Sequence, residues 1–291
     1  MPLYGALDIG SNTLICSVIE EIDGKFKTLK ETIYEAGPEW SLDQGEITYR
    51  GCCFLDKVAE DFLNLQYRLG LRQVFAAGTS LFRASTNGAR VLSDLYNKTN
   101  WDIQLLTGEA EARYAHLAVS TYYENPELVL IDLGGRSTEL AKKDAYLSIS
   151  SGAKALLEEG AGQPLRKIKT NARKHLPELK RWPHSEAWYW VGGTAAALAM
   201  IHLHEKVFIR EHIEGLYIET SQIEEWVLKL DGFSLEERVH ITGLSMNRCQ
   251  MLVPGLVLLE ALLHKYKVPG VKISTLGFRQ GLVIGGVCAH Q

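Results

Sequence analysis

Two short segments, one in each half of the chain, combine an aspartate with small residues in a pattern that suits phosphate and metal binding. These segments are Asp8-Ile9-Gly10-Ser11-Asn12 and Asp132-Leu133-Gly134-Gly135. An aspartate that ends a buried strand and enters a tight turn lies beside exposed backbone N–H groups, which bind phosphate oxygens, while its carboxylate suits a divalent cation. A single turn of this kind is often an ordinary β-turn. The repeat favours two related loops that hold one phosphate chain and its metal ion.

We expect these loops to supply both the metal ligands and the phosphate contacts. Asp8 and Asp132 are the expected ligands of the divalent cation. The residues that follow each aspartate are the expected phosphate contacts: Gly10, Ser11, Asn12, Gly134, Gly135, Arg136 and Ser137.

Two other segments allow both a functional and a structural interpretation. Gly193 and Thr194 open a small-residue helix after an aromatic strand, where free N–H groups and the helix dipole suit an anion. Close packing of this helix on the strand explains the same glycine about equally well. Arg83 is either a solvated helix residue or a residue whose guanidinium binds phosphate through two N–H donors.

A pair of glutamates begins one of the expected helices. Glu109 and Glu111 point about 200° apart on a helix, so only one of them can face a given site. Glutamates in a first turn commonly compensate the helix dipole at the surface, and this interpretation stays open for both. No HExxH, GxSxG, Walker A or GxGxxG pattern occurs in the chain.

Strands and helices are expected to alternate around these residues. In the first half, the apolar periodicity predicts strands at 3–9, 14–20, 25–30, 74–77 and 103–106 and helices at 53–69, 81–96 and 109–123. In the second half, it predicts strands at 128–133, 146–150, 188–191 and 271–275 and helices after Gly152, Gly193, Leu252 and Arg279. The first half therefore has the order β-β-β-α-β-α-β-α, and the second half begins in the same way.

The repeat indicates two copies of one fold. The polar stretch at 124–127 is the clearest break in the chain, so we expect domains at 1–124 and 125–278. The C-terminal helix, at 279–291, is expected to pack back on the first domain.

Composition excludes several classes of protein. With 46% hydrophobic and 23% charged residues the chain is not disordered, and its net charge of −4 argues against broad binding to nucleic acid or to an acidic membrane. Five cysteines without CxxC spacing indicate reduced thiols and a cytoplasmic location. No signal peptide pattern or uninterrupted apolar stretch of about 18 residues occurs. The oligomeric state stays open, a homodimer included.

The motifs, in their order along the chain, resemble those of one family. They are Leu7 to Thr13, Gly78-Thr79 with Arg83, Gly108 to Arg113, Ile131 to Gly135, Ser150 to Gly152, Gly193 to Ala195 and Gly277 to Gly281. Together they are similar to the exopolyphosphatase and guanosine pentaphosphate phosphatase (Ppx/GppA) family, within the actin, hexokinase and sugar-kinase superfamily. The resemblance covers nearly the whole chain. It implies an α/β protein with two ribonuclease H-like (actin-like ATPase) domains that face a cleft, each a copy of the β-β-β-α-β-α-β-α core.

The resemblance also implies a reaction and roles for individual residues. Glu111 corresponds to a catalytic base that activates water against a terminal phosphorus, and Arg83 to a phosphate ligand. Asp8 and Asp132 then position Mg²⁺, or another divalent cation, or the attacking water. The implied substrates are inorganic polyphosphate, which loses terminal orthophosphate, and guanosine pentaphosphate, which loses its 5′-phosphate; guanosine tetraphosphate is an expected ligand.

Departures from the family pattern leave two alternatives open. Arg136 stands where the family has a third glycine, and an arginine usual in the family is missing near 35–37. The alternatives are a catalytically weakened protein that binds alarmone or polyphosphate, and an ATPase or kinase of the same superfamily. We expect Arg136 to need positive φ, at a cost of about 1 kcal/mol, and to bind phosphate in compensation. An arginine that blocks the site, and one that points to solvent from an unstrained turn, are the other possibilities.

Overall fold

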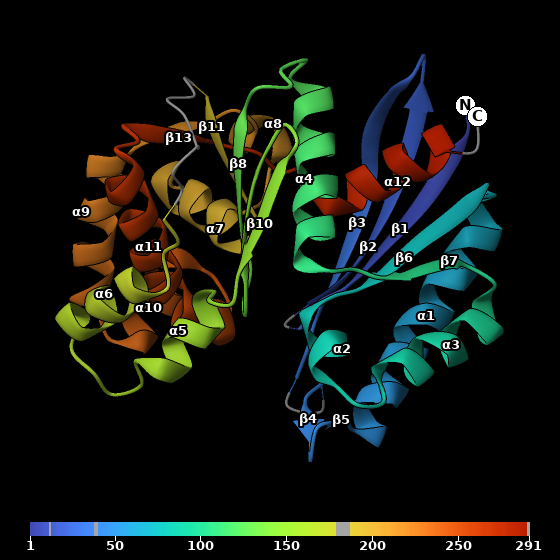
Figure 1. Ribbon diagram of the computed structural model, residues 1–291, viewed down its shortest axis with the longest axis horizontal. Coiled ribbons are helices and arrows are strands. Elements are labelled where there is room, and N and C mark those ends of the chain that lie inside the picture. Colours follow the sequence, from blue (N-terminus) through green and yellow to red (C-terminus); the bar gives the residue numbers. More distant parts are fainter. Residues whose placement is uncertain (12, 38–39, 179–186, 290–291) are drawn as a thin grey trace. The chain divides into compact units, whose positions relative to one another are not determined.

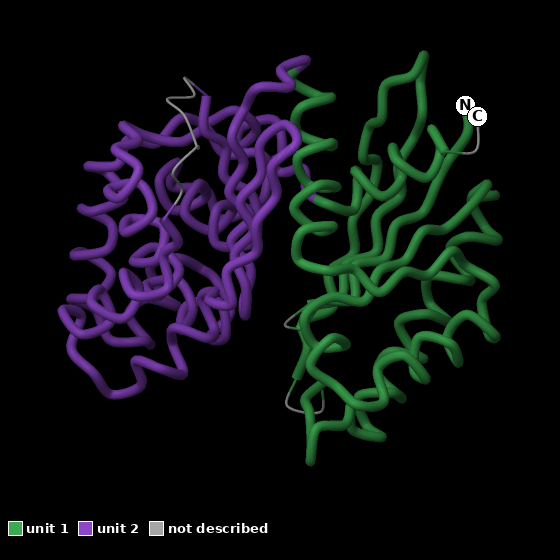
Figure 2. Tube along the Cα trace, viewed as in Figure 1, with its two compact units in different colours: residues 1–123, 278–291 green, residues 124–277 purple. Residues whose placement is uncertain are grey.

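The computed structural model describes residues 1–291 apart from 12, 38–39, 179–186 and 290–291, and it divides the chain into two compact units. Unit 1 comprises Met1–Tyr123 and Phe278–Gln291, and unit 2 comprises Glu124–Gly277 (Figure 2). The chain therefore passes from one unit to the other twice, after Tyr123 and after Gly277. The last helix belongs to unit 1, although it follows unit 2 in the sequence.

Unit 1 is built on a five-stranded sheet with the strand order β3-β2-β1-β6-β7 (Figure 1). Its strands are β1 (Leu3–Ile9), β2 (Thr13–Ile22), β3 (Lys25–Glu35), β6 (Gln73–Gly78) and β7 (Asp102–Leu105). The first three strands form an antiparallel meander, whereas β1, β6 and β7 are parallel. The carboxyl ends of these three parallel strands consequently meet at one edge of the sheet.

Helices cover both faces of this sheet. They are α1 (Tyr49–Leu69), α2 (Ser80–Ala84), α3 (Gly88–Thr99), α4 (Gly108–Tyr122) and α12 (Phe278–Ala289). Because side chains alternate along a strand, Val74 and Ala76 of β6 join the core with α1 and α3, while Phe75 packs against α12 on the other face. Figure 1 shows α12 beside α4 on that second face.

The single helix predicted at 81–96 is wrong, because the chain forms α2 and α3 with a break between them. Ser85 is extended there, with φ −98° and ψ 146°. The amide side chain of Asn87 accepts a hydrogen bond from the N–H of Ile47 (2.8 Å) and donates one to its carbonyl (3.0 Å). The break thus anchors the hairpin of β4 (Leu42–Asp43) and β5 (Glu46–Ile47). Ser, Asn and Gly at 85–88 favour such a turn over a continuous helix.

Small residues let α12 approach its neighbours closely. A Cβ atom at Gly281 would overlap the backbone oxygen of Tyr114 in α4, and one at Gly286 would overlap the ring of Phe75. At Gly281 the obstacle is backbone, which cannot turn aside as a flexible side chain does. The contact between α12 and α4 therefore depends on glycine at this position.

Replacing Gly281 with alanine is expected to destabilise the protein by about 3 kcal/mol or more, because the methyl group forces α12 away from α4. Urea unfolding measures the change. Gly277→Ala is the control, since a Cβ there meets nothing within 4 Å and the change should stay below about 1 kcal/mol. Equal stability of both variants would show that α12 shifts freely.

Unit 2 repeats the arrangement of unit 1 and extends it by one strand. Its sheet has the order β10-β9-β8-β11-β13-β12. The strands are β8 (Val129–Leu133), β9 (Thr138–Lys142), β10 (Ala145–Ile149), β11 (Trp188–Val191), β12 (Tyr217–Glu219) and β13 (Gly270–Ile273). Strands β8, β9 and β10 form an antiparallel meander, and β8, β11 and β13 are parallel, as in unit 1. The predicted duplication of an α/β core is confirmed, with β12 as an added antiparallel edge strand.

Seven helices in the described part of unit 2 surround this sheet. They are α5 (Ala153–Glu159), α6 (Leu165–Lys174), α7 (Gly193–His202), α8 (Arg210–Ile213), α9 (Thr220–Asp231), α10 (Leu235–Thr242) and α11 (Met246–Tyr266). Helix α11 begins before the predicted position after Leu252, because Ser245 caps its N-terminus. By length and composition α11 is apolar enough to cross a bilayer, but 72% of its apolar window is buried inside the protein. It is the central core helix of unit 2.

Candidate active site

Three loops of unit 1 follow the carboxyl ends of its parallel strands and are joined by hydrogen bonds. Thr79, after β6, donates its N–H and its hydroxyl to the carbonyl of Ile9 at the end of β1, both at 3.4 Å. Leu106, after β7, donates its N–H to the carbonyl of Gly78 (3.0 Å). The predicted loop at 8–12 therefore lies next to the segments that carry Arg83 and Glu111. Asn12 lies outside the described residues.

Glu111 and Arg83, which belong to different sequence motifs, meet in unit 1. Arg83 Nη1 donates to Glu111 Oε1 and also to the backbone carbonyl of Leu106, the latter at 2.6 Å. Glu111 is only 8% exposed, whereas Glu109 points to solvent. Glu111 is thus the glutamate of this helix turn that faces inward. The Thr107 side chain begins helix α4 by accepting the N–H of Ala110 (3.2 Å), which fixes this first turn.

The Glu111–Arg83 pair combines a proton acceptor with a directional donor. A carboxylate accepts protons and hydrogen bonds, and a guanidinium carries five N–H donors in a planar fork. The Arg83 side chain remains 27% exposed, so part of its fork is accessible from solvent. Such a pair is suited to bind a phosphoryl group and to take a proton from a neighbouring water.

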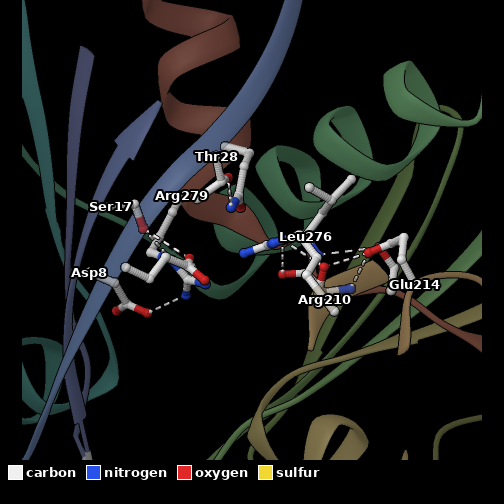
Figure 3. Close-up of polar contacts among 11 residues, drawn as sticks. Asp8, Ser17, Thr28, Arg210, Glu214, Leu276 and Arg279 are labelled. Atoms are coloured by element: carbon white, nitrogen blue, oxygen red, sulfur yellow. Dashed lines mark hydrogen bonds and ion pairs between the residues drawn. The ribbon is translucent and has the colours of Figure 1, made fainter. Parts of the chain in front are cut away.

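Asp8 is ion-paired with an arginine from the other end of the chain. Arg279 Nη1 lies 3.5 Å from Asp8 Oδ2, and its Nη2 lies 3.0 Å from Glu31 Oε1. Arg279 Nε also donates to the hydroxyl of Ser17 (3.2 Å), as Figure 3 shows. The sequence placed Arg279 in a family motif but offered no signal that it would contact Asp8.

The turn after Asp8 is held in place by a buried tryptophan. Trp40 Nε1 donates to the carbonyl of Gly10 (2.8 Å), and the Trp40 ring packs against Phe54 and Phe82 with centroids 6.1 and 5.9 Å away. Trp40 is 3% exposed. A rigid aromatic residue in the core therefore orients the backbone of the loop that follows Asp8.

In unit 2, Asp132 lies opposite a second carboxylate that the sequence analysis missed. Asp132 of β8 pairs directly with Glu139 of β9, so both side chains project from the same face of the sheet. Glu139 is 3% exposed and accepts a hydrogen bond from the hydroxyl of Ser148 (2.8 Å). The only available sequence signal was the alternation along β9, which places Glu139 inward together with Asp132.

The loop after Asp132 uses its carbonyl groups to cap helix α5. The Gly134 carbonyl accepts the N–H of Ala153 (2.9 Å), and the Gly135 carbonyl accepts the N–H groups of Lys154 (2.7 Å) and Ala155 (3.0 Å). The turn itself is closed by a hydrogen bond from Gly134 N–H to the Ser137 carbonyl (3.0 Å). The N–H groups of helix α5 at these three positions are therefore already hydrogen-bonded within the protein. They fix the loop after Asp132 to the helix and are not available to an anion.

The start of helix α7 lies beside Asp132. Gly192 has φ +106°, and a Cβ there would be 2.9 Å from the Leu133 carbonyl and 3.4 Å from Asp132 Oδ1. A Cβ at Gly193 would lie 2.9 Å from Arg248 Nη1, so this guanidinium covers the first turn of α7. The residue that precedes Gly193 and Thr194 therefore lies against Asp132 within unit 2. Packing accounts for Gly192, while the α7 N-terminus keeps the dipole that suits an anion.

The backbone strain expected at Arg136 is wrong. The described non-glycine residues with positive φ do not include Arg136, because the hydrogen-bonded turn at 134–137 is formed without a left-handed residue. The Arg136 guanidinium instead makes two hydrogen bonds with Glu158 of α5, at 3.1 and 3.2 Å. Both side chains are about half exposed, at 42% and 50%. Arg136 is thus accommodated without cost to the backbone.

Comparison with known proteins gives one family for most of the chain. The family model for the Ppx/GppA phosphatase family matches residues 27–290. Exopolyphosphatase 1 of Mycobacterium tuberculosis is 25% identical over 305 aligned positions, which cover 96% of this chain and 87% of that protein.

Solved structures agree in fold. A structure of the Aquifex aeolicus Ppx/GppA enzyme gives a TM-score of 0.85 at 21% identity and covers 98% of this chain and 99% of that one. An exopolyphosphatase from Cytophaga hutchinsonii gives 0.84 at 20% identity, with 98% of each chain covered. The duplicated sheets, the Asp-x-Gly loops and the matched family model lead to one conclusion: the chain belongs to the Ppx/GppA phosphatase family and has the actin-like ATPase fold.

Proposed function

We propose that this phosphatase releases terminal orthophosphate from inorganic polyphosphate by attack of water on the terminal phosphorus. The observation that carries the proposal is the buried Glu111 carboxylate joined to the Arg83 guanidinium at the edge of the unit 1 sheet. Relatives named exopolyphosphatase support the choice of substrate. The 5′-phosphate of guanosine pentaphosphate is the second substrate class of the proposal.

In the proposed reaction, Glu111 accepts a proton from water while the water oxygen forms a bond to phosphorus. The bond from this phosphorus to the bridging oxygen breaks, so the products are orthophosphate and a chain shorter by one unit. Phosphoryl transfer of this kind needs positioning and charge stabilisation more than covalent catalysis. Arg83 supplies directional donors to the phosphoryl oxygens. In unit 1, backbone N–H groups near Ser11 bind a further oxygen. Taken by itself, the start of α7 in unit 2, at Gly193 and Thr194, suits an anion.

Asp132 and Glu139 fit a magnesium ion. Mg²⁺ is usually bound by one or two carboxylates together with substrate phosphates and water, so it does not require a cage of protein ligands. Within the described residues no cluster of three or more His, Cys, Asp or Glu could hold a metal. The pair formed by Asp132 and Glu139 supplies the two carboxylates that Mg²⁺ needs from the protein. An ion bound there would neutralise charge on the phosphate chain.

One assay separates the candidate functions. Orthophosphate release is measured with Mg²⁺ on short polyphosphate, guanosine pentaphosphate and ATP, beside equilibrium binding of each compound. The proposal predicts turnover of polyphosphate, guanosine pentaphosphate or both, and little turnover of ATP. Tight binding without turnover would support an alarmone- or polyphosphate-binding protein, and turnover of ATP alone would support an ATPase or kinase.

The cysteines support a cytoplasmic location as part of the proposal. All five are free: Cys16 and Cys249 are buried, and Cys52, Cys53 and Cys288 are partly or fully exposed. Burial raises the pKa of the Cys16 thiol, so it stays protonated and inert. A chain that keeps unpaired, accessible thiols suits a reducing compartment.

Arg136 is expected to contribute to phosphate binding. We expect Arg136→Gly to weaken orthophosphate or polyphosphate binding and to lower turnover, because a fork beside the Asp132 loop is lost. Loss of the exposed pair with Glu158 should itself cost at most about 1 kcal/mol of stability. Isothermal calorimetry measures the change in phosphate binding, and orthophosphate release measures the change in turnover.

Glu158→Gln is the matched variant, because it breaks the same pair but leaves Arg136 in place. It should preserve or tighten phosphate binding, since the guanidinium loses its competing carboxylate. Faster hydrolysis by Arg136→Gly would contradict this expectation and would show that the arginine obstructs the site.

A further inference from the structure

Arg279 is held by three groups on neighbouring strands, one of which belongs to the proposed site. Its Nη2 pairs with Glu31 of β3 at 3.0 Å, its Nε donates to Ser17 of β2 at 3.2 Å, and its Nη1 faces Asp8 of β1 at 3.5 Å (Figure 3). Ser17 in turn donates to Glu31 (3.0 Å). The guanidinium plane is therefore fixed by β2 and β3, and its remaining end is directed at Asp8.

The charges in this cluster matter because the groups are largely removed from water. The side chains of Arg279 and Asp8 are each 13% exposed, and that of Glu31 is 17% exposed. A carboxylate in such surroundings needs a partner of opposite charge. Arg279 also stands in the first turn of α12, where the helix dipole disfavours a cation unless carboxylates surround it. The cluster thus explains an arginine in an otherwise unfavourable position.

We propose that Arg279 is a positioning residue that serves Asp8 as a built-in counter-cation, so that Asp8 acts on water or phosphate as a fixed carboxylate and does not bind the metal ion. A divalent cation on the same carboxylate would lie within a few ångströms of the guanidinium and be repelled by it. The inference rests on the proposed function, in which Asp8 belongs to the site, and it differs from the expectation that Asp8 and Asp132 both hold metal.

A double-mutant cycle tests whether Arg279 acts through Asp8. Arg279→Gln should lower kcat for orthophosphate release at least ten-fold and change KM less than three-fold, because the carboxylate loses its orientation while substrate contacts remain. Arg279→Lys, which keeps the charge but not the fork, should recover part of the loss. In an Asp8→Asn background, Arg279→Gln should lower kcat by less than two-fold. Equal losses in both backgrounds would overturn the proposal.

Gln280→Met is the matched control for a purely structural role. Gln280 is the next residue of α12, is 2% exposed, and anchors the same helix turn to Thr28 of β3 at 3.0 Å. It should lower the melting temperature as Arg279→Gln does and leave kcat within two-fold of the original protein. A drop of kcat in Gln280→Met as large as in Arg279→Gln would show that anchoring of α12 explains the effect.

Divalent-ion binding gives a readout that does not depend on hydrolysis. Free Mn²⁺, followed by electron paramagnetic resonance, should reveal the same affinity in the original protein and in Asp8→Asn within two-fold. A ten-fold weaker Mn²⁺ affinity in Asp8→Asn would assign Asp8 to the metal and overturn the inference.

Failure of the proposed function is distinguishable from failure of the inference. If the protein hydrolyses none of the phosphate compounds, the proposed function is wrong. The double-mutant cycle of Asp8 and Arg279 is then measured as changes in the free energy of unfolding in urea. Asp8→Asn and Arg279→Gln together should then destabilise the protein less than the two separate effects would predict. Strictly additive effects in that experiment would overturn the pairing of the two residues.

Discussion

Replacing Glu111 with glutamine is expected to lower kcat for orthophosphate release by about 10² to 10⁴ while ligand affinity is nearly retained. Glutamine keeps the size of the side chain and its ability to accept a hydrogen bond from Arg83, but it cannot take a proton from water. Because Glu111 is almost fully buried, few other groups can replace it as the acceptor. Steady-state orthophosphate release and calorimetric binding of a short polyphosphate measure the two quantities.

Glu109→Gln is the control for this prediction. Glu109 lies in the same helix turn, but it is exposed and points away from Arg83, so its replacement should change kcat by less than about two-fold. A thermal melt of each variant separates loss of catalysis from loss of folding, since the Glu111–Arg83 pair also links α4 to α2. Undiminished turnover in Glu111→Gln would refute the assignment of the base.

The second large effect is expected at Asp132 and Glu139. Asp132→Asn or Glu139→Gln should raise the Mg²⁺ concentration for half-maximal activity by about ten-fold to a hundred-fold, because each change removes one of two carboxylates on the same face of the sheet. The double variant should lose less than the product of the two single losses, since the proposal assigns both residues to one ion. Mn²⁺ binding measures the same effect without substrate.

Asp144→Asn is the matched control for the metal site. Asp144 is an exposed carboxylate in the turn between β9 and β10, with φ +58°, which asparagine also tolerates. It removes the same charge a few residues from Glu139 and should leave the Mg²⁺ requirement unchanged. An equal shift in Asp144→Asn would mean that general charge, rather than a specific pair, attracts the ion.

Much of the fold could be predicted because its signals are local. The alternation of apolar residues located the strands of the first meander and the first and third strands of the second, and the repeated Asp-x-Gly turn after Asp8 and Asp132 revealed the duplication. The error at 81–96 arose because apolar periodicity does not register the turn-forming residues at 85–88, whose hydrogen-bond partner Ile47 lies 40 positions away in the sequence. At 85–87 the docking of the β4–β5 hairpin onto Asn87 divides a helix that periodicity predicted as continuous.

The sequence by itself determined the family, the α/β class and most candidate residues, because these depend on residue type and on spacing over a few positions. Only the tertiary structure decided the partners of those residues. Glu111 meets Arg83, Asp132 faces Glu139, and Asp8 is paired with Arg279 from the opposite end of the chain. The physical reason is that a buried charge needs its counter-charge within a few ångströms in space, whatever the separation of the two residues along the chain. The register of the strands and the return of α12 to unit 1 therefore set each pairing.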